Sequence, residues 1–590
     1  MMFSLFHLFA CSSDLPSIQE MKRAEIVLDH GWDHRLWDTD LPPRFPKMNI
    51  STTVDIDSTL PIDGSSLELS GLWYVGTVSI NGEQLSPFYG GLHSVEVMIG
   101  EHLRYGKNNI QIAFSAPTNI SERVTGGSLS SKTKKGTSAA ILVPPKLHLR
   151  PATHISGMTI KSSDGTVTPI AWIENPLEGL SITFTAKLDG KTISKLGECP
   201  ISTGQSICSA TKFRQPQWNI GQPFLFHLVG ELRHNGKIID QYSIRTGART
   251  IEWDKSTLKI NQKSANLLAA RMVAGEKPLS FSDRLKIYSR AKINTLEFHG
   301  EHLNKKWLDY ADELGMAIAI VPRCIGRCPT EKAVASSTEK QLMSLADHRL
   351  IWDTYRHPSV TMFVLEGDYK LPWNKDSLWT ETLQNNLHNI PIFGLDLPAK
   401  VLQVSRNGSA RCRPGLCNQK IDEHGVSRCV PDNCSPSWII ESIMMNGFVP
   451  WSIMSSTYAD IHQQGLYGGV IPTPNQRDIE IWSENWSSAA ARINPDPIPD
   501  TRLRSNSDIT IINAAPNSIV TVSHPGHQLI GAITNNNGSA KVQIYFKGDA
   551  EVNCGEVRQK HQVLSSFWEK SERISRENIV DCGYSPTASE

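Results

Sequence analysis

The sequence predicts a multidomain protein in which two β-sandwiches precede a (β/α)8 barrel and a small β domain follows it. A chain of 590 residues is too long for one hydrophobic core. Up to about residue 254, short alternating strands and turns occur without a long helical period. After residue 255 strands and helices alternate, which predicts parallel β/α units, and beyond residue 505 the pattern returns to strands.

The first domain is predicted over residues 20–150 as a jelly-roll sandwich. Residues 67–82 alternate between apolar and polar side chains and end in Asn81-Gly82, which is a strong hairpin signal. Within the domain, residues 118–150 are rich in Ser, Thr, Gly and Lys and are predicted to be a flexible crossing.

The second domain is predicted over residues 151–254 as an immunoglobulin-like sandwich. Its hairpin turns are expected at Asp189-Gly190 and at Asn235-Gly236, because Asp-Gly and Asn-Gly favour the two-residue turns that join antiparallel strands.

Residues 255–493 are predicted to form the barrel. Residues 281–292 and 305–314 have helical periodicity, Gly315 is placed to cap the second of these helices, and residues 293–298 and 316–321 are the strands that follow. The region is shorter than the roughly 250 residues usual for this fold, so some units are expected to be reduced.

A linker and a last domain complete the predicted organisation. Residues 494–504 include Asn494-Pro495-Asp496-Pro497-Ile498-Pro499, a stiff linker by composition, and residues 505–590 are predicted to form a small C-terminal β domain.

The N-terminal residues 1–19 suggest export. An apolar run ends in Leu8-Phe9-Ala10-Cys11, as in a bacterial lipoprotein signal, although the run is short and lacks a basic segment. The expected location is the bacterial periplasm or cell surface, with membrane attachment only through a lipidated Cys11. Lys+Arg and Asp+Glu are equal at 59 each, so no overall field favours binding to nucleic acid.

The cysteines support an oxidising compartment. Apart from Cys11, ten cysteines fall into local groups, which predicts disulfides between Cys199 and Cys208, between Cys554 and Cys582, and within the quartet at 412–434. A structural zinc site formed by the quartet is the alternative, although the quartet lacks the usual pair of cysteines with two residues between them. We otherwise expect no metal and no organic cofactor.

Five segments, in the same order, resemble glycoside hydrolase family 2. The resemblance covers about residues 65–500, each motif is weak by itself, and the order makes the set specific. The motifs are residues 67–82 with 105–110, Pro216-Gln217-Trp218 with residues 240–252, residues 293–300 with Trp307-Leu308-Asp309-Tyr310-Ala311-Asp312-Glu313-Leu314-Gly315, Arg356-His357-Pro358-Ser359-Val360 through Asp368, and Gly447-Phe448-Val449-Pro450-Trp451. Within the family, residues 294–300 and the Asp that ends the fourth motif are most similar to exo-β-D-glucosaminidases.

The resemblance implies a retaining β-glycosidase, exo-acting on β-linked sugars or amino sugars. Such an enzyme needs two carboxyl groups ~5–5.5 Å apart, carried at the carboxyl ends of the barrel strands. The motif places the general acid/base on Asp368, with Glu366 as the backup. The substrate contacts expected in addition are His299, Glu301, Tyr369, Trp373 and Trp451.

The nucleophile is less well defined by the sequence. Glu423, in Ile421-Asp422-Glu423-His424-Gly425, matches the family motif superficially, while a surface turn is an equally good interpretation of the same residues. Glu297 also occupies the position where the family has the Arg that orients the nucleophile. A carboxylate there would raise the pKa of a neighbouring carboxyl group. The alternative hypothesis is therefore a catalytically degenerate carbohydrate-binding protein on the same scaffold.

Overall fold

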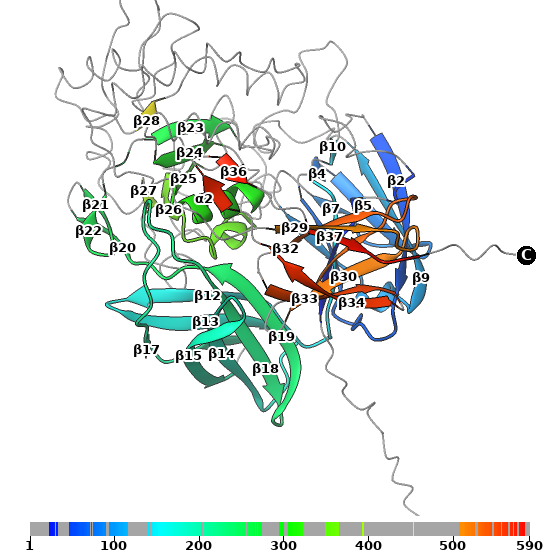
Figure 1. The fold of residues 1–590 in the computed structure, drawn as a ribbon, viewed down its shortest axis with the longest axis horizontal. Helices are drawn as coiled ribbons and strands as arrows, with labels where there is room; N and C mark the ends of the chain where they lie inside the picture. Colours follow the sequence, from blue (N-terminus) through cyan, green and yellow to red (C-terminus); the bar gives the residue numbers. More distant parts are fainter. Residues whose placement is uncertain are drawn as a thin grey trace, which may run out of the picture.

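The protein contains two complete β-sandwiches, a third that shares a sheet with the first, and a parallel sheet (Figure 1). Our computed structural model describes residues 23–29, 31–33, 47–70, 72–73, 75–89, 94–115, 140–141, 143–201, 204–254, 257–265, 267, 269–273, 294–299, 305–321, 349–364, 392–393, 452–453, 507–524, 529–544, 548–555, 557–564, 567–569, 572–574 and 578–584.

The first sandwich packs two antiparallel sheets around an aliphatic core that includes Val78, Ile80, Ile110 and Ile112. One sheet consists of β1 (Ala24–Val27), β11 (Lys146–Leu149), β3 (Ser66–Leu69) and β8 (Val95–Met98). The other consists of β2 (Lys47–Ile56), β9 (Gly106–Ser115), β5 (Val75–Ile80), β6 (Glu83–Gln84) and β7 (Phe88–Tyr89), and β4 (Leu72–Trp73) pairs separately with β10 (Ala140–Ile141). The predicted hairpin is confirmed, because Asn81 and Gly82 have φ values of 53° and 89° between β5 and β6.

The second sandwich has the predicted hairpins as well. One sheet consists of β12 (His154–Ser163), β13 (Thr166–Glu174), β16 (Gln205–Ile207) and β17 (Thr211–Lys212), and the other of β15 (Lys191–Pro200), β14 (Leu180–Leu188), β18 (Phe226–His234) and β19 (Lys237–Thr246). Asp189-Gly190 joins β14 to β15 and Asn235-Gly236 joins β18 to β19, with positive φ at all four residues. The predicted disulfide between Cys199 and Cys208 is confirmed.

The C-terminal strands pack around a core of short aliphatic side chains such as Ile509, Val520 and Val552. Its strands are β29 (Ser507–Ile512), β30 (Ile519–Ser523), β31 (Leu529–Ile533), β32 (Ala540–Ile544), β33 (Gly548–Cys554), β34 (Val557–Val563), β35 (Phe567–Glu569), β36 (Glu572–Ile574) and β37 (Asn578–Asp581). Cys554 and Cys582 form the second predicted disulfide.

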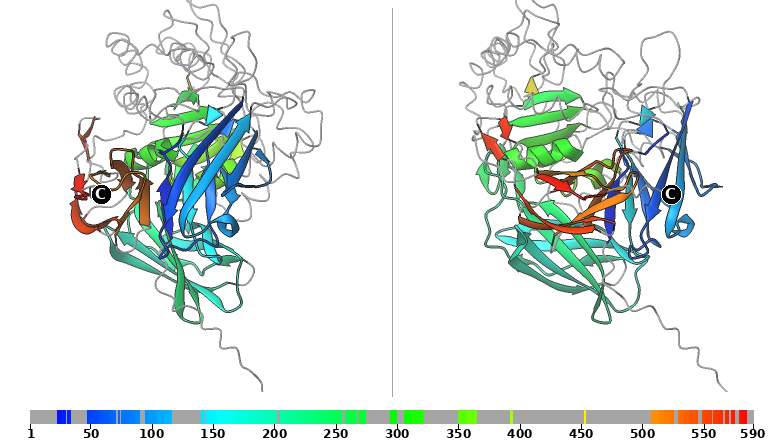
Figure 2. Two further views of the ribbon diagram at one scale, coloured as in Figure 1. Left: turned by 90° about the vertical axis from the view of Figure 1, so that its right-hand side faces the viewer. Right: turned by 45° about the vertical axis from the view of Figure 1, so that its right-hand side comes forward.

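The C-terminal domain shares a sheet with the first sandwich, which the sequence did not predict. Strand β31 pairs in parallel with β1, from Ala24 opposite Leu529 to Val27 opposite Ala532. The resulting eight-stranded sheet runs in the order β34-β33-β30-β31-β1-β11-β3-β8. The two ends of the chain therefore form one continuous layer, in which orange and blue strands lie side by side (Figures 1 and 2).

The region after residue 255 contains the predicted parallel sheet. Its strands are β27 (Ile392–Phe393), β26 (Val360–Val364), β25 (Ala317–Val321), β24 (Thr295–His299), β23 (Ala269–Val273) and β28 (Ser452–Ile453), in that order across the sheet, and every pair is parallel. Helix α2 (Lys305–Leu314) ends at Gly315, whose φ of 66° confirms the predicted cap. A small sheet of β20 (Ile251–Asp254), β21 (Thr257–Ile260) and β22 (Lys263–Ser264) lies between the second sandwich and this region in the sequence.

The strand order is that of consecutive β/α units, with β28, late in the chain, beside β23, the first strand. The described strands do not include a pairing between β27 and β28, so the closed barrel stays a prediction. Several other predictions lie outside the described residues: the helix at 281–292, the linker at 494–504, Cys324 and Cys328, and the cysteine quartet at 412–434. In the part of the chain that the structure describes, no helix has both the length and the apolar character needed to cross a membrane.

Candidate active site

The carboxyl ends of three central strands meet at one edge of the parallel sheet. His299, the last residue of β24, is in register with Val321, the last residue of β25, and β26 ends at Val364 beside them. In parallel β/α folds this edge carries the catalytic side chains, because the loops that follow the strands enclose the substrate there. Asp368 and Glu366 follow directly after β26 in the sequence.

Most of the predicted site residues lie outside the described residues. These are Glu301, Glu366, Asp368, Tyr369, Trp373, Glu423 and Trp451. The backbone of His299 lies at the carboxyl edge of the sheet, and its role as a substrate contact stays a prediction.

The sheet register reveals a residue that our sequence analysis missed. Arg271 on β23 is the register partner of Glu297 on β24. The family motif has an Arg at the position of Glu297. In this chain an Arg lies instead on the neighbouring strand, at the same level of the sheet. The sequence signal was the apolar run around Arg271, which is a strand pattern with one basic residue.

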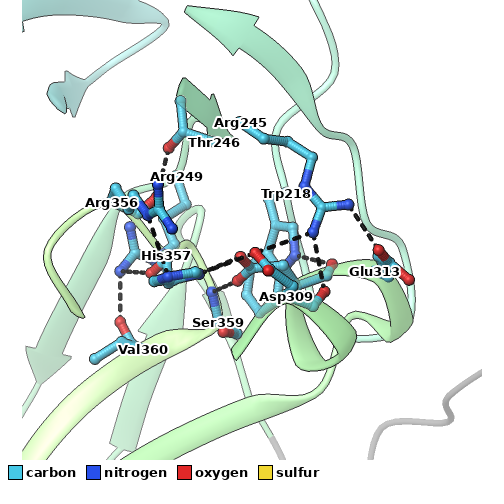
Figure 3. A network of polar contacts seen from close by, with 11 residues as sticks. Trp218, Arg245, Thr246, Arg249, Asp309, Glu313, Arg356, His357, Ser359 and Val360 are labelled. Atoms are coloured by element: carbon cyan, nitrogen blue, oxygen red, sulfur yellow. Dashed lines mark hydrogen bonds and ion pairs between the residues drawn. The ribbon is translucent and has the colours of Figure 1, made fainter. Parts of the chain in front are cut away.

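The opposite, amino-terminal end of the same strands carries a buried polar network (Figure 3). Asp312, on helix α2, is 1% exposed and lies at its centre. One carboxylate oxygen contacts His357 Nδ1 at 2.7 Å and the other accepts the Ser359 backbone N–H at 2.9 Å. Because Arg356 Nε donates to His357 Nε2 at 3.4 Å, Nδ1 is the ring nitrogen that donates to Asp312.

The second sandwich supplies two of the cations of this network, Arg245 and Arg249. Arg245, on β19, contacts Glu313 through Nη1 at 2.7 Å and the Asp309 carboxylate through Nη2 at 3.2 Å. Both acidic residues lie on α2, so the guanidinium joins β19 to the helix. Thr246 adds a hydrogen bond of 2.8 Å from its hydroxyl to the Arg356 carbonyl.

Arg249 and Trp218 complete the contact between the two domains. The Trp218 ring N–H donates to the Asp312 carbonyl at 2.8 Å, and Arg249 Nη2 donates to the Val360 carbonyl. Burial lowers the pKa of Arg249 to about 10, and the Asp312 carboxylate opposes that shift. A guanidinium with this pKa is charged at neutral pH, so the network holds a buried cation next to a carboxylate.

The network lies at the start of strand β26 and fixes its position. Asp312 accepts the Ser359 N–H, and β26 begins at the next residue, Val360. Five residues at ~3.3 Å each put the other end of β26 about 15 Å away. The motifs around Trp218, Asp312 and His357, which the sequence analysis identified separately, thus meet in one place at the end of the strands remote from the candidate catalytic residues.

Among the residues that the structure describes, two groups of side chains have metal-ligand geometry: Asp309, Asp312 and His357, and Glu68, Glu96 and His148. In each, protein cations already compensate the carboxylates, because Arg245 contacts Asp309 and Arg150 contacts Glu96 at 3.0 Å. In the second group, His148 Nε2 also lies 2.9 Å from a carboxylate oxygen of Glu68. The chemistry of both groups is that of ion-pair networks that do not need a metal.

No protein-family model matches the sequence, and no curated protein matches it. Among solved structures, the chain is similar to the apo β-glucuronidase from Ruminococcus gnavus, with 14% identity and a TM-score of 0.51 over 64% of this chain and 73% of that one. The same enzyme in complex with D-glucuronic acid matches with 14% identity and a TM-score of 0.50, over the same shares of the two chains. A GH2 β-galacturonidase from Eisenbergiella tayi, bound to glycerol, matches with 14% identity and a TM-score of 0.47, over 58% and 61% of the chains. The likeness to the Ruminococcus gnavus enzyme is one of fold.

Proposed function

We propose that the protein is a retaining glycoside hydrolase of the family 2 type, acting on the ends of β-linked sugars or amino sugars. The observation that carries the proposal is the run of parallel strands β23-β24-β25-β26, which follows two β-sandwiches in the sequence. The candidate catalytic segment follows the carboxyl end of β26. The fold that the protein shares with a β-glucuronidase supports the same reaction class. Fold alone does not define chemistry, so the proposal depends on the residues at that edge.

Asp368 is assigned the general acid, which protonates the glycosidic oxygen as the bond to the anomeric carbon breaks. Glu366, two residues earlier, is the backup for this role. Glu423 is nominated as the nucleophile that attacks the anomeric carbon, and water then hydrolyses the glycosyl–enzyme ester with Asp368 acting as base. Arg271, in register with Glu297, is the cation that we assign to compensate the carboxylates of the site.

The substrate class is narrower than the reaction class. The segment 294–300 and Asp368 favour an amino sugar, whereas the neighbour in fold acts on a glucuronide. His299, Glu301, Tyr369, Trp373 and Trp451 are the proposed contacts for the sugar. Export to the periplasm or the cell surface, with Cys11 as the lipid anchor, would place the enzyme beside extracellular glycans.

The test is nitrophenol release from β-D-glucosaminide, β-D-glucuronide, β-D-glucoside and β-D-galactoside, by wild type, Asp368→Asn and Glu366→Gln. We expect Asp368→Asn to lower turnover of a natural disaccharide by ~10²–10⁴-fold, the usual worth of a general acid. Nitrophenyl substrates should lose much less, because their leaving group needs little protonation. An equal loss on both kinds of substrate would remove Asp368 from the role. Binding of sugar without hydrolysis of any substrate would establish the degenerate carbohydrate-binding protein instead.

A further inference from the structure

A cavity of about 430 Å³ lies where the second sandwich meets the small sheet of β20–β22. Four segments line it: the turn at Asp164-Gly165 between β12 and β13, the segment with Phe213, Arg214, Gln215 and Gln217, Thr250, and the turn at Asn261-Gln262 between β21 and β22. Asn261 Nδ2 donates to the Trp218 carbonyl at 2.9 Å, so the cavity adjoins the amino-terminal end of the parallel sheet. It is therefore separate from the proposed active site, which lies at the carboxyl end.

The backbone of one wall is held in an unfavourable conformation. Asn261 and Gln262 have φ values of 51° and 66°, and they form a two-residue hairpin turn in which Gly is preferred at the second position. A residue with a Cβ is disfavoured in the left-handed region. The Gln262 side chain lines the cavity, where its Nε2 donates to Asp164 Oδ1 at 3.2 Å.

Four of the polar side chains that line the cavity are oriented by hydrogen bonds within the protein: Asp164, Gln215, Asn261 and Gln262. Asn261 uses both ends of its amide, since its Oδ1 accepts the Thr250 N–H at 2.9 Å. Gln215 donates to the Ile193 carbonyl at 3.2 Å, which leaves its amide oxygen as an acceptor. Within the described residues, the Arg214 guanidinium and the Gln217 amide make no hydrogen bond, and both line the cavity as donors.

These groups match the chemistry of a sugar. Adjacent hydroxyl groups each donate and accept, and they are bound by planar amide, carboxylate and guanidinium groups. The charges of Asp164 and Arg214 cancel, so the lining does not select an ion. From this geometry we infer that the cavity is a second carbohydrate site, which binds the end of a neutral saccharide independently of hydrolysis.

The test uses the full chain carrying Asp368→Asn, so that a substrate is not consumed, with cellobiose, lactose, maltose and mannobiose as probes in isothermal titration and saturation-transfer NMR. At least one neutral disaccharide should bind, and Gln262→Gly or Gln217→Ala should weaken binding by about tenfold or more. Gln262→Gly relieves backbone strain, so loss of binding is not explained by misfolding. Lys263→Ala, an exposed change on the adjoining strand, is the matched control and should bind as the parent does.

Three outcomes overturn the inference. Binding of no neutral disaccharide excludes the site, and binding that survives both substitutions places the sugar elsewhere. Preferential binding of D-glucuronic acid, lost in Arg214→Ala, would make the cavity an anion site. Hydrolysis by the Gln262→Gly variant of the otherwise wild-type chain should equal that of wild type. If the wild-type chain hydrolyses no substrate but binds a neutral disaccharide, and Gln262→Gly abolishes that binding, the proposed function is refuted and the second carbohydrate site stands.

Discussion

Asp312→Ala should destabilise the contact between the second sandwich and the parallel sheet. The substitution leaves two buried donors without an acceptor, the His357 Nδ1–H and the Ser359 N–H, and it removes the carboxylate that faces Arg249. An unpaired buried donor costs about 1–3 kcal/mol, and breaking a buried ion pair about 3–5 kcal/mol. Since these costs overlap, we expect a total of about 4 kcal/mol.

Differential scanning calorimetry of the full chain measures the effect. For domains of this size, 4 kcal/mol corresponds to a fall of roughly 10 °C in the transition that includes the second sandwich and the parallel sheet. Asp312→Asn, which keeps an acceptor for Ser359, should cost about half as much. Asp55→Ala, an exposed change on β2, is the control and should leave every transition unchanged. An unaltered scan for Asp312→Ala would show that the network does not stabilise this contact.

Three further predictions concern stability. Burial lowers the pKa of His154 to about 4, below its value of about 6.5 in an unfolded chain, so the unfolded state binds the proton first. Between pH 7 and pH 5 the free energy of unfolding should therefore fall by about 2 kcal/mol, and urea titration of His154→Gln should show that dependence removed; an unchanged pH profile in the variant would contradict it. A disulfide that closes a longer loop stabilises more, and Cys554 and Cys582 are separated by 28 residues, whereas Cys199 and Cys208 are separated by 9. Reduction should therefore lower the free energy of unfolding by about 3.6 kcal/mol for Cys554–Cys582 and by about 2.7 kcal/mol for Cys199–Cys208. The order is tested by scanning each Cys→Ser pair, and the reverse order would exclude the loop-entropy explanation. A chain ending at residue 504 lacks β31 and exposes the edge of β1, so it should aggregate in light scattering; a monodisperse chain would show that the shared sheet is dispensable.

Local chemistry explains what the sequence could predict. Asn81-Gly82, Asp189-Gly190 and Asn235-Gly236 all form the expected turns, because positive φ is a property of the residues themselves. Gly315 ends α2 for the same reason, and the two described disulfides join cysteines that are close in the sequence.

Non-local pairing explains what the sequence could not predict. Strand β31 joins β1 although about 500 residues separate them, and no periodicity within either strand specifies a distant partner. The motifs around Trp218, Asp312 and His357 were identified as a series, yet that series did not show that their side chains would form one network. Arg271 was missed because its importance depends on register with Glu297, which only the sheet defines.

Retaining hydrolysis of a β-glycoside is the reaction that we propose for this protein. Proton NMR of the wild-type chain, mixed with nitrophenyl β-D-glucosaminide or β-D-glucuronide, follows the anomer released before mutarotation. Retention through two carboxyl groups ~5–5.5 Å apart predicts that the β-anomer is released first. Release of the α-anomer first would refute the assigned mechanism, and absence of hydrolysis across the nitrophenyl β-glycosides would refute the enzyme.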